Sequence, residues 1–316
     1  MALVSTPSFD PNPLASHISA AEGKAKTKLD RDPQQPLINR AISQTYPPGS
    51  TFKLVVEAAA LSDGMSKDTK LPTAATIKLP DGVTPLSNFG FETCPGNTMF
   101  AALAYSCNTA FATLAGRLGR DKLAAQATAF GIGEDTPTIP IPVATSELGP
   151  MADPDAVFQS GIGQRDVRLT PLQDAMTTAT IANGGRRMQP QLVRKVLASD
   201  LSTLTGFSAT QADQAISPQV ADTLKQMMES SEVHTSGGGK RADLKIASKT
   251  GTAEHGLHPK RTPPHAWYTA FAPADRPQVA VAVLVENGGN RGLAATGSSV
   301  AAGVGRTTID AAVGGP

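Results

Sequence analysis

Three short motifs, separated by long stretches of chain, constrain this 316-residue sequence more than any other feature. In chain order they are Ser50-Thr-Phe-Lys53, Ser106-Cys-Asn108 and Lys249-Thr-Gly251. Each motif alone is common and carries little weight, but the set in this order is typical of a serine acyl-transfer site. It offers a nucleophile, a base, a proton relay and a strand that binds a carboxylate, so the fold has to bring these distant segments together.

The serine of the first motif is expected at the start of a buried helix. Pro47-Pro48-Gly49 ends any regular element before it, and the apolar run 52–61 suits a helix inside the protein. Ser50 then lies in the positive end of the backbone dipole. Lys53, one turn further on the same face, can act as a base if burial and a second cation such as Lys249 keep it neutral. The alternative is an ordinary N-cap serine followed by a solvated lysine.

The second motif lies between two segments that have a helical pattern. Ser106 is a candidate proton shuttle, and Asn108 is a candidate amide partner for Lys53 and for a substrate. In isolation, a serine and an asparagine at this place would equally suit the cap of the second helix.

The third motif is expected in a β-strand over residues 244–253, which follows a flexible triple glycine at 237–239. Gly251 leaves room for a ligand backbone at the strand edge, where a peptide substrate could add as a further strand. An ordinary edge strand with a glycine bulge is the alternative.

Alternation along that strand places Thr250 and Thr252 on one face. Together with Lys249, these threonines would supply hydroxyl groups and positive charge for the terminal carboxylate of a peptide. The backbone N–H groups of Ser50 and Thr252 are candidate oxyanion donors.

With these motifs in place, the sequence resembles the transpeptidase domain of class B penicillin-binding proteins over essentially its whole length. The resemblance extends to Asn-Arg at 39–40, Gly-Ile-Gly-Gln at 161–164, Thr-Pro-Leu-Gln at 170–173, Lys-Thr-Gly-Thr-Ala-Glu at 249–254, Ala-Trp-Tyr at 266–268, Phe-Ala-Pro at 271–273 and the segment 2–12. It implies a D,D-transpeptidase that cross-links peptidoglycan stem peptides during cell division and is inhibited covalently by β-lactams. No cofactor is expected.

Carried over position by position, the resemblance assigns a role to each motif residue. Ser50 would be the acylated nucleophile and Lys53 its general base. Ser106, Asn108 and Lys249 would complete the catalytic set, with Ser106 and Lys249 relaying a proton to the leaving amine. The substrate-binding strand would consist of Lys249, Thr250, Gly251 and Thr252.

The resemblance also implies the fold class, an α+β arrangement like that of serine β-lactamases. A five-stranded antiparallel sheet flanked by helices would lie beside a mostly helical subdomain, with the site in the cleft between them. The whole chain would be one transpeptidase domain, with an α/β subdomain at about 1–61 and 235–316 and a helical subdomain at about 62–234. Residues 2–12 would open the domain as a strand, and 298–313 would close it as a helix.

Local signals predict further elements without the resemblance. Hydrophobic patterning and capping residues predict helices over 121–130, 170–181 and 218–233, and a buried strand over 279–285.

Members of this class act outside the cytoplasmic membrane and carry an N-terminal anchor and an upstream non-catalytic module. The sequence contains no run long and apolar enough to span a bilayer, and it starts inside the expected first strand, so we expect the anchor to be absent from this chain. Division proteins would then be partners of the absent N-terminal region. A formal net charge of +1 gives no indication of a nucleic-acid partner.

The two cysteines, Cys94 and Cys107, are the only ones in the sequence. An even pair in an exported domain suggests a disulfide, which would hold the loop that carries Ser106. Two buried free thiols are the alternative.

Four histidines lie near the third motif: His234, His255, His258 and His265. Their spacing fits no helical pair of metal ligands and the proposed chemistry needs no ion, so no metal site is expected. Exposed loop histidines are the simpler interpretation.

Other functions use the same motifs. Class A β-lactamases add a glutamate in a Glu-x-x-Leu-Asn pattern, which is absent here, and class D enzymes usually have a hydrophobic residue in place of Asn108. A D,D-carboxypeptidase would use water as the acceptor. A β-lactam sensor, or a division module without turnover, is the non-enzymatic alternative.

Overall fold

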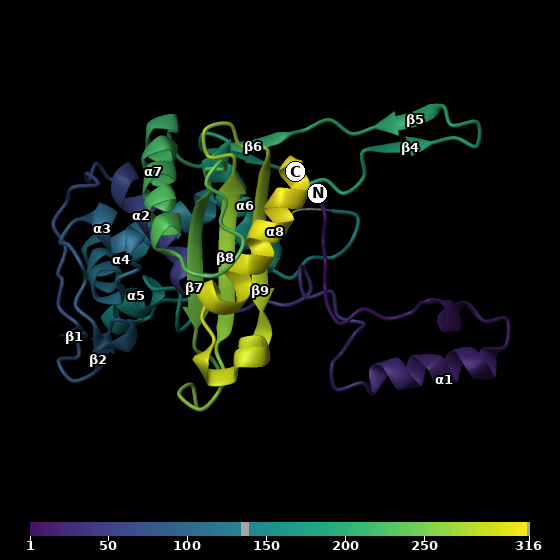
Figure 1. Ribbon diagram of the computed structural model, residues 1–316, viewed down its shortest axis with the longest axis horizontal. Coiled ribbons are helices and arrows are strands. Elements are labelled where there is room, and N and C mark those ends of the chain that lie inside the picture. Colours follow the sequence, from purple (N-terminus) through teal and green to yellow (C-terminus); the bar gives the residue numbers. More distant parts are fainter. Residues whose placement is uncertain (134–138, 315–316) are drawn as a thin grey trace.

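The computed structural model describes residues 1–133 and 139–314, and an antiparallel sheet lies at its centre (Figure 1). Within these residues the sheet has three strands in the order β7-β8-β9: β7 (Ala247–Ala253), β8 (His265–Ala272) and β9 (Val279–Val285). β8 is buried along its whole length, whereas β7 and β9 form the two edges.

Helices cover both faces of this sheet. They are η5 (Gly297–Ala301) and α8 (Ala302–Val313) on one face and α6 (Pro171–Ala182) on the other, with α7 (Pro218–His234) beside β7. Successive side chains of β8 point alternately to the two faces of the sheet and so contact the helices on both. Tyr268 packs in the same cluster as Ile309 of α8, whereas the Thr269 hydroxyl lies 2.6 Å from that of Thr178 on α6.

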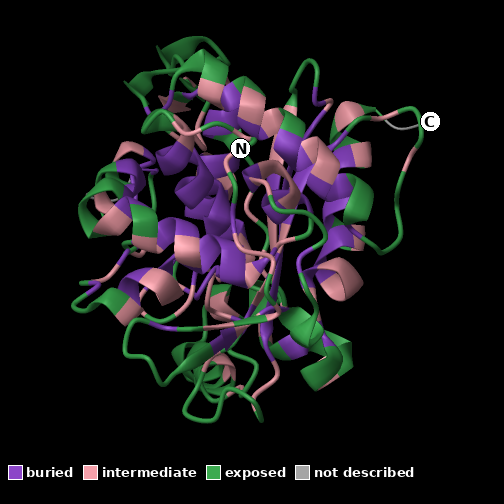
Figure 2. Ribbon diagram, turned by 90° about the vertical axis from the view of Figure 1, so that its left-hand side faces the viewer, coloured by how far each residue is buried: buried purple, intermediate pink, exposed green. Residues whose placement is uncertain are grey.

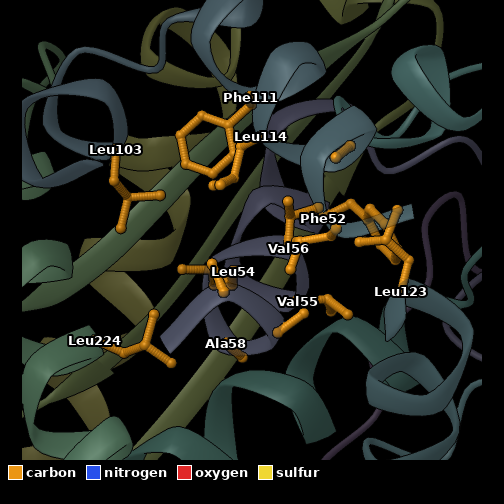
Figure 3. Packing of buried hydrophobic residues seen from close by; sticks show 14 of the residues in the cluster. Phe52, Leu54, Val55, Val56, Ala58, Leu103, Phe111, Leu114, Leu123 and Leu224 are labelled. Atoms are coloured by element: carbon orange, nitrogen blue, oxygen red, sulfur yellow. The ribbon is translucent and has the colours of Figure 1, made fainter. Parts of the chain in front are cut away.

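A helical body lies on the β7 side of the sheet (Figure 1). Its elements are η2 (Gly49–Phe52), α2 (Lys53–Ser62), α3 (Met99–Ala104), α4 (Asn108–Ala129) and α5 (Pro154–Ser160). α2 is at its centre, with eight of ten residues buried and apolar side chains such as Leu54 and Val56 packed among those of α4 (Figure 3). Each such buried side chain contributes about 1.5–3 kcal/mol, so α2 is held firmly in place.

The remaining elements are short or peripheral, and Figure 2 shows the exposed loops surrounding a buried centre. They are η1 (Asn12–Ala15), α1 (Ser19–Asp30), β1 (Thr76–Lys78), β2 (Pro85–Ser87), η3 (Phe89–Phe91), β3 (Arg186–Met188), β4 (Lys195–Leu197), β5 (Thr203–Gly206), β6 (Gln211–Gln214) and η4 (Glu286–Ala294). The strands pair as β1–β2, β3–β6 and β4–β5. α1 has no buried residue and projects from the body (Figure 1).

The expected fold class is confirmed, but the sheet differs in one respect. Among the described residues it has three strands where five were expected, and the segment 2–12 is not one of them. Pro7 and Pro11 lack the N–H donors that a ladder needs, and most of the segment is exposed.

The local predictions agree closely with the structure. α6, α7 and β9 confirm the elements expected over 170–181, 218–233 and 279–285, and α8 confirms the closing helix. The helix predicted over 121–130 is the second half of α4, after a kink at Gly119, whose φ is +78°. Among the described helices, none has the length and apolar character that a membrane span requires.

Candidate active site

The first motif lies at the start of η2, where the chain passes β7. Pro48 is the N-cap, and Ser50 belongs to the first turn, where backbone N–H groups have no partner within the helix. Gly49 has φ +54°, and a Cβ there would lie 2.8 Å from the carbonyl oxygen of Thr252. Glycine therefore allows the turn that carries Ser50 to touch β7.

Ser50 itself is half-buried, and its hydroxyl makes no hydrogen bond to another described residue. Lys53, expected as its base, directs its amine to the second motif instead. Lys53 Nζ donates to Ser106 O at 2.7 Å and to Asn108 Oδ1 at 2.8 Å, and lies 3.3 Å from Ser106 Oγ. Hydrogen bonds between a nucleophile and its base, here Ser50 and Lys53, often tighten only when substrate is bound.

Lys53 is buried, and its environment favours the neutral amine. Burial lowers the pKa of Lys53 well below its ordinary value, and the nearby positive charge of Lys249 lowers this pKa further. The expectation of a buried lysine next to a second cation is therefore met, and the alternative of a solvated lysine is wrong.

Ser106 connects the two lysines. Lys249 Nζ donates to Ser106 Oγ at 2.8 Å and to Thr250 O at 2.9 Å. Ser106 has φ +58°, an unusual conformation for a residue other than glycine, and such strain often accompanies functional positions. Lys249 is also buried, which lowers its pKa to about 7. One hydroxyl thus lies between two buried amines whose pKa values are both lowered.

Asn108 begins α4 and anchors the second motif to the neighbouring loop. Its Oδ1 accepts from Lys53, while its Nδ2 donates to Ser87 O at 3.1 Å. The structure also joins Cys94 to Cys107 in a disulfide, across a sequence separation of 13. On chain-entropy grounds, closing a loop of this size stabilises the fold by about 3 kcal/mol and restrains the segment before α4.

The third motif occupies the β7 edge. Thr250 and Thr252 are half-buried on one face, as alternation predicts, and Lys249 points to the other. Thr252 Oγ1 accepts from the Gly297 N–H at 3.2 Å, so part of its hydrogen-bonding capacity is used by η5.

Gly251 has a different explanation from the one expected. A Cβ at this position would lie 2.6 Å from Pro48 O and 3.2 Å from Thr51 Cγ2. The space at Gly251 is thus filled by the protein itself, and it allows the nucleophile turn to pack on β7.

A buried ionic network lies behind β7, directly next to Lys249. Arg306 of α8 donates through Nε to Glu232 Oε1 at 2.7 Å. The other carboxylate oxygen of Glu232 accepts from Ser248 and, at 3.1 Å, from Tyr268. Ser248, Tyr268 and Arg306 are fully buried. This Glu232–Arg306 network therefore ties β7, α7 and α8 together at the position of the third motif.

The same arginine holds the glycine segment that precedes β7. Arg306 Nη1 donates to the carbonyl oxygens of Ser236, Gly237 and Gly238 at 2.8–3.1 Å. The sequence predicted a flexible approach over 237–239, but these bonds tether the segment to α8.

Sequence reasoning missed the two carboxyl groups that are buried near the first motif. Asp174 on α6 is fully buried, which raises its pKa to about 7, although hydrogen bonds from Thr51 and Thr269 oppose that shift. Glu57 on α2 is buried with no hydrogen-bond partner for its carboxyl oxygens among the described residues, and burial raises its pKa well above the usual range. For Glu57, the sequence did contain a signal of a buried carboxyl group, because this acidic residue lies among the apolar residues of α2.

The histidines are not all exposed loop residues. His265 begins β8, is buried and stacks on His255 with ring centroids 3.8 Å apart. Burial and the neighbouring His255 lower the pKa of His265 to about 4, which keeps its ring neutral. The expectation of exposure was therefore wrong for His265, whose ring packs between those of His255 and Tyr46.

The family follows from a comparison with known proteins. Residues 1–310 match the family model described as the penicillin binding protein transpeptidase domain. The chain belongs to this family, which confirms the expectation from the motifs.

Individual relatives extend this finding. The chain is 54% identical to the peptidoglycan D,D-transpeptidase PbpA of Mycolicibacterium smegmatis, over 99% of this chain and 64% of that protein. It is similar to the structure of penicillin-binding protein A from M. tuberculosis in a ceftriaxone acyl-enzyme complex, with a TM-score of 0.97, 48% identity and coverage of 99% and 71%. Pseudomonas aeruginosa PBP2 is more distant, with a TM-score of 0.78, 31% identity and coverage of 98% and 67%. The chain thus spans less than two thirds of the M. smegmatis relative.

Proposed function

We propose that the chain is a D,D-transpeptidase that cross-links peptidoglycan stem peptides through a Ser50 acyl-enzyme. The observation that carries the proposal is the shared contact of Lys53 and Lys249 with the Ser106 hydroxyl, next to a serine at a helix start. A neutral buried amine beside a nucleophile turn is what activation of a serine requires. The names of the relatives support the same reaction.

Each residue has a definite role in the proposed reaction. Neutral Lys53 takes the proton of Ser50 as Ser50 Oγ attacks the carbonyl of the penultimate D-alanine. The N–H groups of Ser50 and Thr252 hold the resulting oxyanion, and the amide of Asn108 keeps Lys53 in place. Ser106 and Lys249 deliver a proton to the departing D-alanine, and an amine from a second stem peptide then attacks the acyl-enzyme.

The third motif would bind the substrate along the edge of β7. The Thr250 and Thr252 hydroxyls meet the terminal carboxylate of the donor, while Lys249 adds positive charge from the side of Ser106. The peptide backbone adds to the open strand edge. β-Lactams would acylate Ser50 in the same way. We further infer an α/β subdomain at about 1–61 and 235–316 and a helical subdomain at about 62–234, with the reaction at their junction.

We also place this reaction on the outer side of the cytoplasmic membrane, where peptidoglycan is assembled, and we assign it to cell division. An N-terminal membrane anchor and contacts with other division proteins belong to the same proposal. The names of the relatives as peptidoglycan transpeptidases support the extracytoplasmic setting.

The function can be tested by exchange of labelled D-alanine. The protein is incubated with a synthetic stem peptide ending in D-Ala-D-Ala and an excess of isotopically labelled D-alanine, and the peptides are analysed by mass spectrometry. We expect the terminal residue to become labelled, because the acyl-enzyme accepts an amine. Protein that has first been acylated with benzylpenicillin is the matched control and should give no exchange.

Two results would contradict the proposal. A peptide shortened by one residue, without labelled product, would indicate a D,D-carboxypeptidase. Rapid hydrolysis of benzylpenicillin with no lasting adduct on the protein would indicate a β-lactamase.

The pH dependence of acylation follows from Lys249, whose pKa is lowered to about 7 by burial. Below this pH the amine is cationic and attracts the β-lactam carboxylate, and above it the charge is lost. For Lys53, burial and the neighbouring Lys249 lower the pKa well below its ordinary value, which favours the neutral amine. Since a charge-assisted hydrogen bond contributes about 1.5–3 kcal/mol, we expect the second-order rate constant with benzylpenicillin to fall about tenfold from pH 6 to pH 9.

The matched variant for this pH profile is Lys249→Arg, whose guanidinium stays charged throughout the range. Its alkaline decline should disappear, whatever its absolute rate. A wild-type profile that is flat above pH 7, or the same decline in the arginine variant, would show that Lys249 does not control the rate.

A further inference from the structure

A shallow cavity of about 540 Å³, wide open to solvent, lies on the surface of the helical body between β1, α4 and α5. This volume is typical of small-molecule sites, which range over about 300–1,000 Å³. None of the residues that line it belongs to the three motifs. Along α4, the cavity residues Thr113 and Arg117 are five and nine residues from Asn108, which corresponds to about 7.5 and 13.5 Å of helix. The cavity is therefore separate from the candidate active site.

Three cations surround this cavity without a carboxylate to balance them. Lys70, Lys78 and Arg117 line it, and none of them forms an ion pair within residues 1–133 and 139–314. Lysines nearby in the fold do have acidic partners: Lys67 pairs with Asp68, and Lys122 pairs with Asp63. Grouped, unbalanced positive charge repels itself and attracts anions.

Two of these cations are held by neutral groups rather than by acids. Arg117 Nη1 donates to Lys70 O at 2.9 Å, which leaves its other N–H groups without a partner among the described residues. Lys70 Nζ donates to Asn97 Oδ1 at 3.1 Å. A planar guanidinium with free donors, next to two ammonium groups, suits the several oxygens of a phosphoryl group better than a single carboxylate.

The rest of the cavity wall is largely apolar. The Phe158 ring is half-buried against α4 at Gly116, where a Cβ would lie 2.1 Å from the ring. A glycine at this point thus allows the ring to rest on the helix backbone. Leu71 and Ile77 add aliphatic surface to the same cavity. An occupant therefore meets both positive charge and the Phe158 side chain in the same cavity.

We propose that this cavity binds an organic phosphate, with its phosphoryl group between Lys70, Lys78 and Arg117 and its apolar group against Phe158. Such a ligand is either a soluble phosphate ester or the headgroup region of an anionic phospholipid, and the test separates these sources. Because the cavity shares no residue with the three motifs, this proposal does not depend on the transpeptidase reaction.

The first measurement is the affinity for 1-naphthyl phosphate, determined by isothermal titration calorimetry at low ionic strength. We expect saturable 1:1 binding. Inorganic phosphate and 1-naphthol should each bind at least about tenfold more weakly, because the first lacks the apolar group and the second lacks the phosphoryl group. Binding should weaken as salt is added. Absence of binding at millimolar ligand, or equal affinity for inorganic phosphate, would overturn the proposal.

Matched variants show whether the cavity is responsible. Lys78→Gln and Arg117→Gln should each weaken binding about five- to tenfold, since each removes one charge-assisted contact. Lys195→Gln is the control, because Lys195 is also an exposed lysine in a two-stranded pair but lies in β4, outside the cavity. It should leave the affinity within about twofold. Equal weakening in all three variants would mean that only net charge matters, which contradicts a specific site.

Vesicles separate the two sources of phosphate. Sedimentation with phosphatidylglycerol vesicles that is lost in Arg117→Gln, but not in Lys195→Gln, would assign the site to a lipid headgroup. The ligand is a soluble phosphate ester if the vesicles do not bind, while 1-naphthyl phosphate binds and its affinity falls in Lys78→Gln and Arg117→Gln but not in Lys195→Gln. Unchanged melting temperatures of the variants would confirm that the substitutions act on binding and not on folding.

Discussion

Ser50→Ala protein should form no covalent adduct with benzylpenicillin, whereas the wild-type protein should gain one equivalent that persists for hours. The substitution removes the only group proposed to attack the lactam carbonyl, and Lys53 cannot replace it because its amine is directed to Ser106 and Asn108. Intact-protein mass spectrometry measures both outcomes directly. The loss should be complete and not partial, because an absent nucleophile leaves no covalent route.

The fold should tolerate this substitution. The Ser50 hydroxyl makes no hydrogen bond to another described residue, so the free energy of unfolding should change by no more than about 0.5 kcal/mol. Ser43→Ala is a matched control, because Ser43 is an exposed serine before the motif and should leave acylation intact. An adduct on Ser50→Ala, or its loss in Ser43→Ala, would show that the nucleophile has been misassigned.

Local chemistry explains why much of the candidate site could be predicted from the sequence. The prolines and glycine before Ser50 end one element and open the next, and the spacing to Lys53 follows from the helical repeat. The serine cap of α7 is likewise a signal within four residues. Such features need only neighbouring residues, so they were correctly placed.

Features that depend on distant contacts could not be predicted in the same way. Glu232 and Arg306 are 74 positions apart, and neither lies in a motif, so their pairing follows only from the packing of α7 and α8 around β7. The true reason for Gly251, the approach of Pro48 O, is also a contact between remote segments. The strands β3, β4, β5 and β6 were missed because none of them buries a residue completely, so they lack a regular apolar pattern.

Among stability changes, Arg306→Ala should have the largest effect. Arg306 is fully buried, balances the Glu232 carboxylate and donates to four backbone carbonyls between Thr235 and Gly238. Removing one partner of a buried ion pair leaves an uncompensated charge and costs about 3–5 kcal/mol. The sole tryptophan, Trp267, is buried in β8, so its fluorescence during denaturant unfolding reports the loss.

Two further variants show whether the loss of stability comes from the buried Glu232–Arg306 network or would follow from any arginine substitution near α8. Arg241→Ala removes an arginine that pairs with Asp243 and Asp310 near the surface, and it should cost less than about 1 kcal/mol. Adding Glu232→Gln to Arg306→Ala should restore part of the lost stability, because it removes the charge left unpaired. If Arg306→Ala costs no more than Arg241→Ala, or if the second substitution only adds to the loss, the network does not hold β7 in place. Acylation of the folded fraction should also slow, since Ser248 of this network directly precedes Lys249.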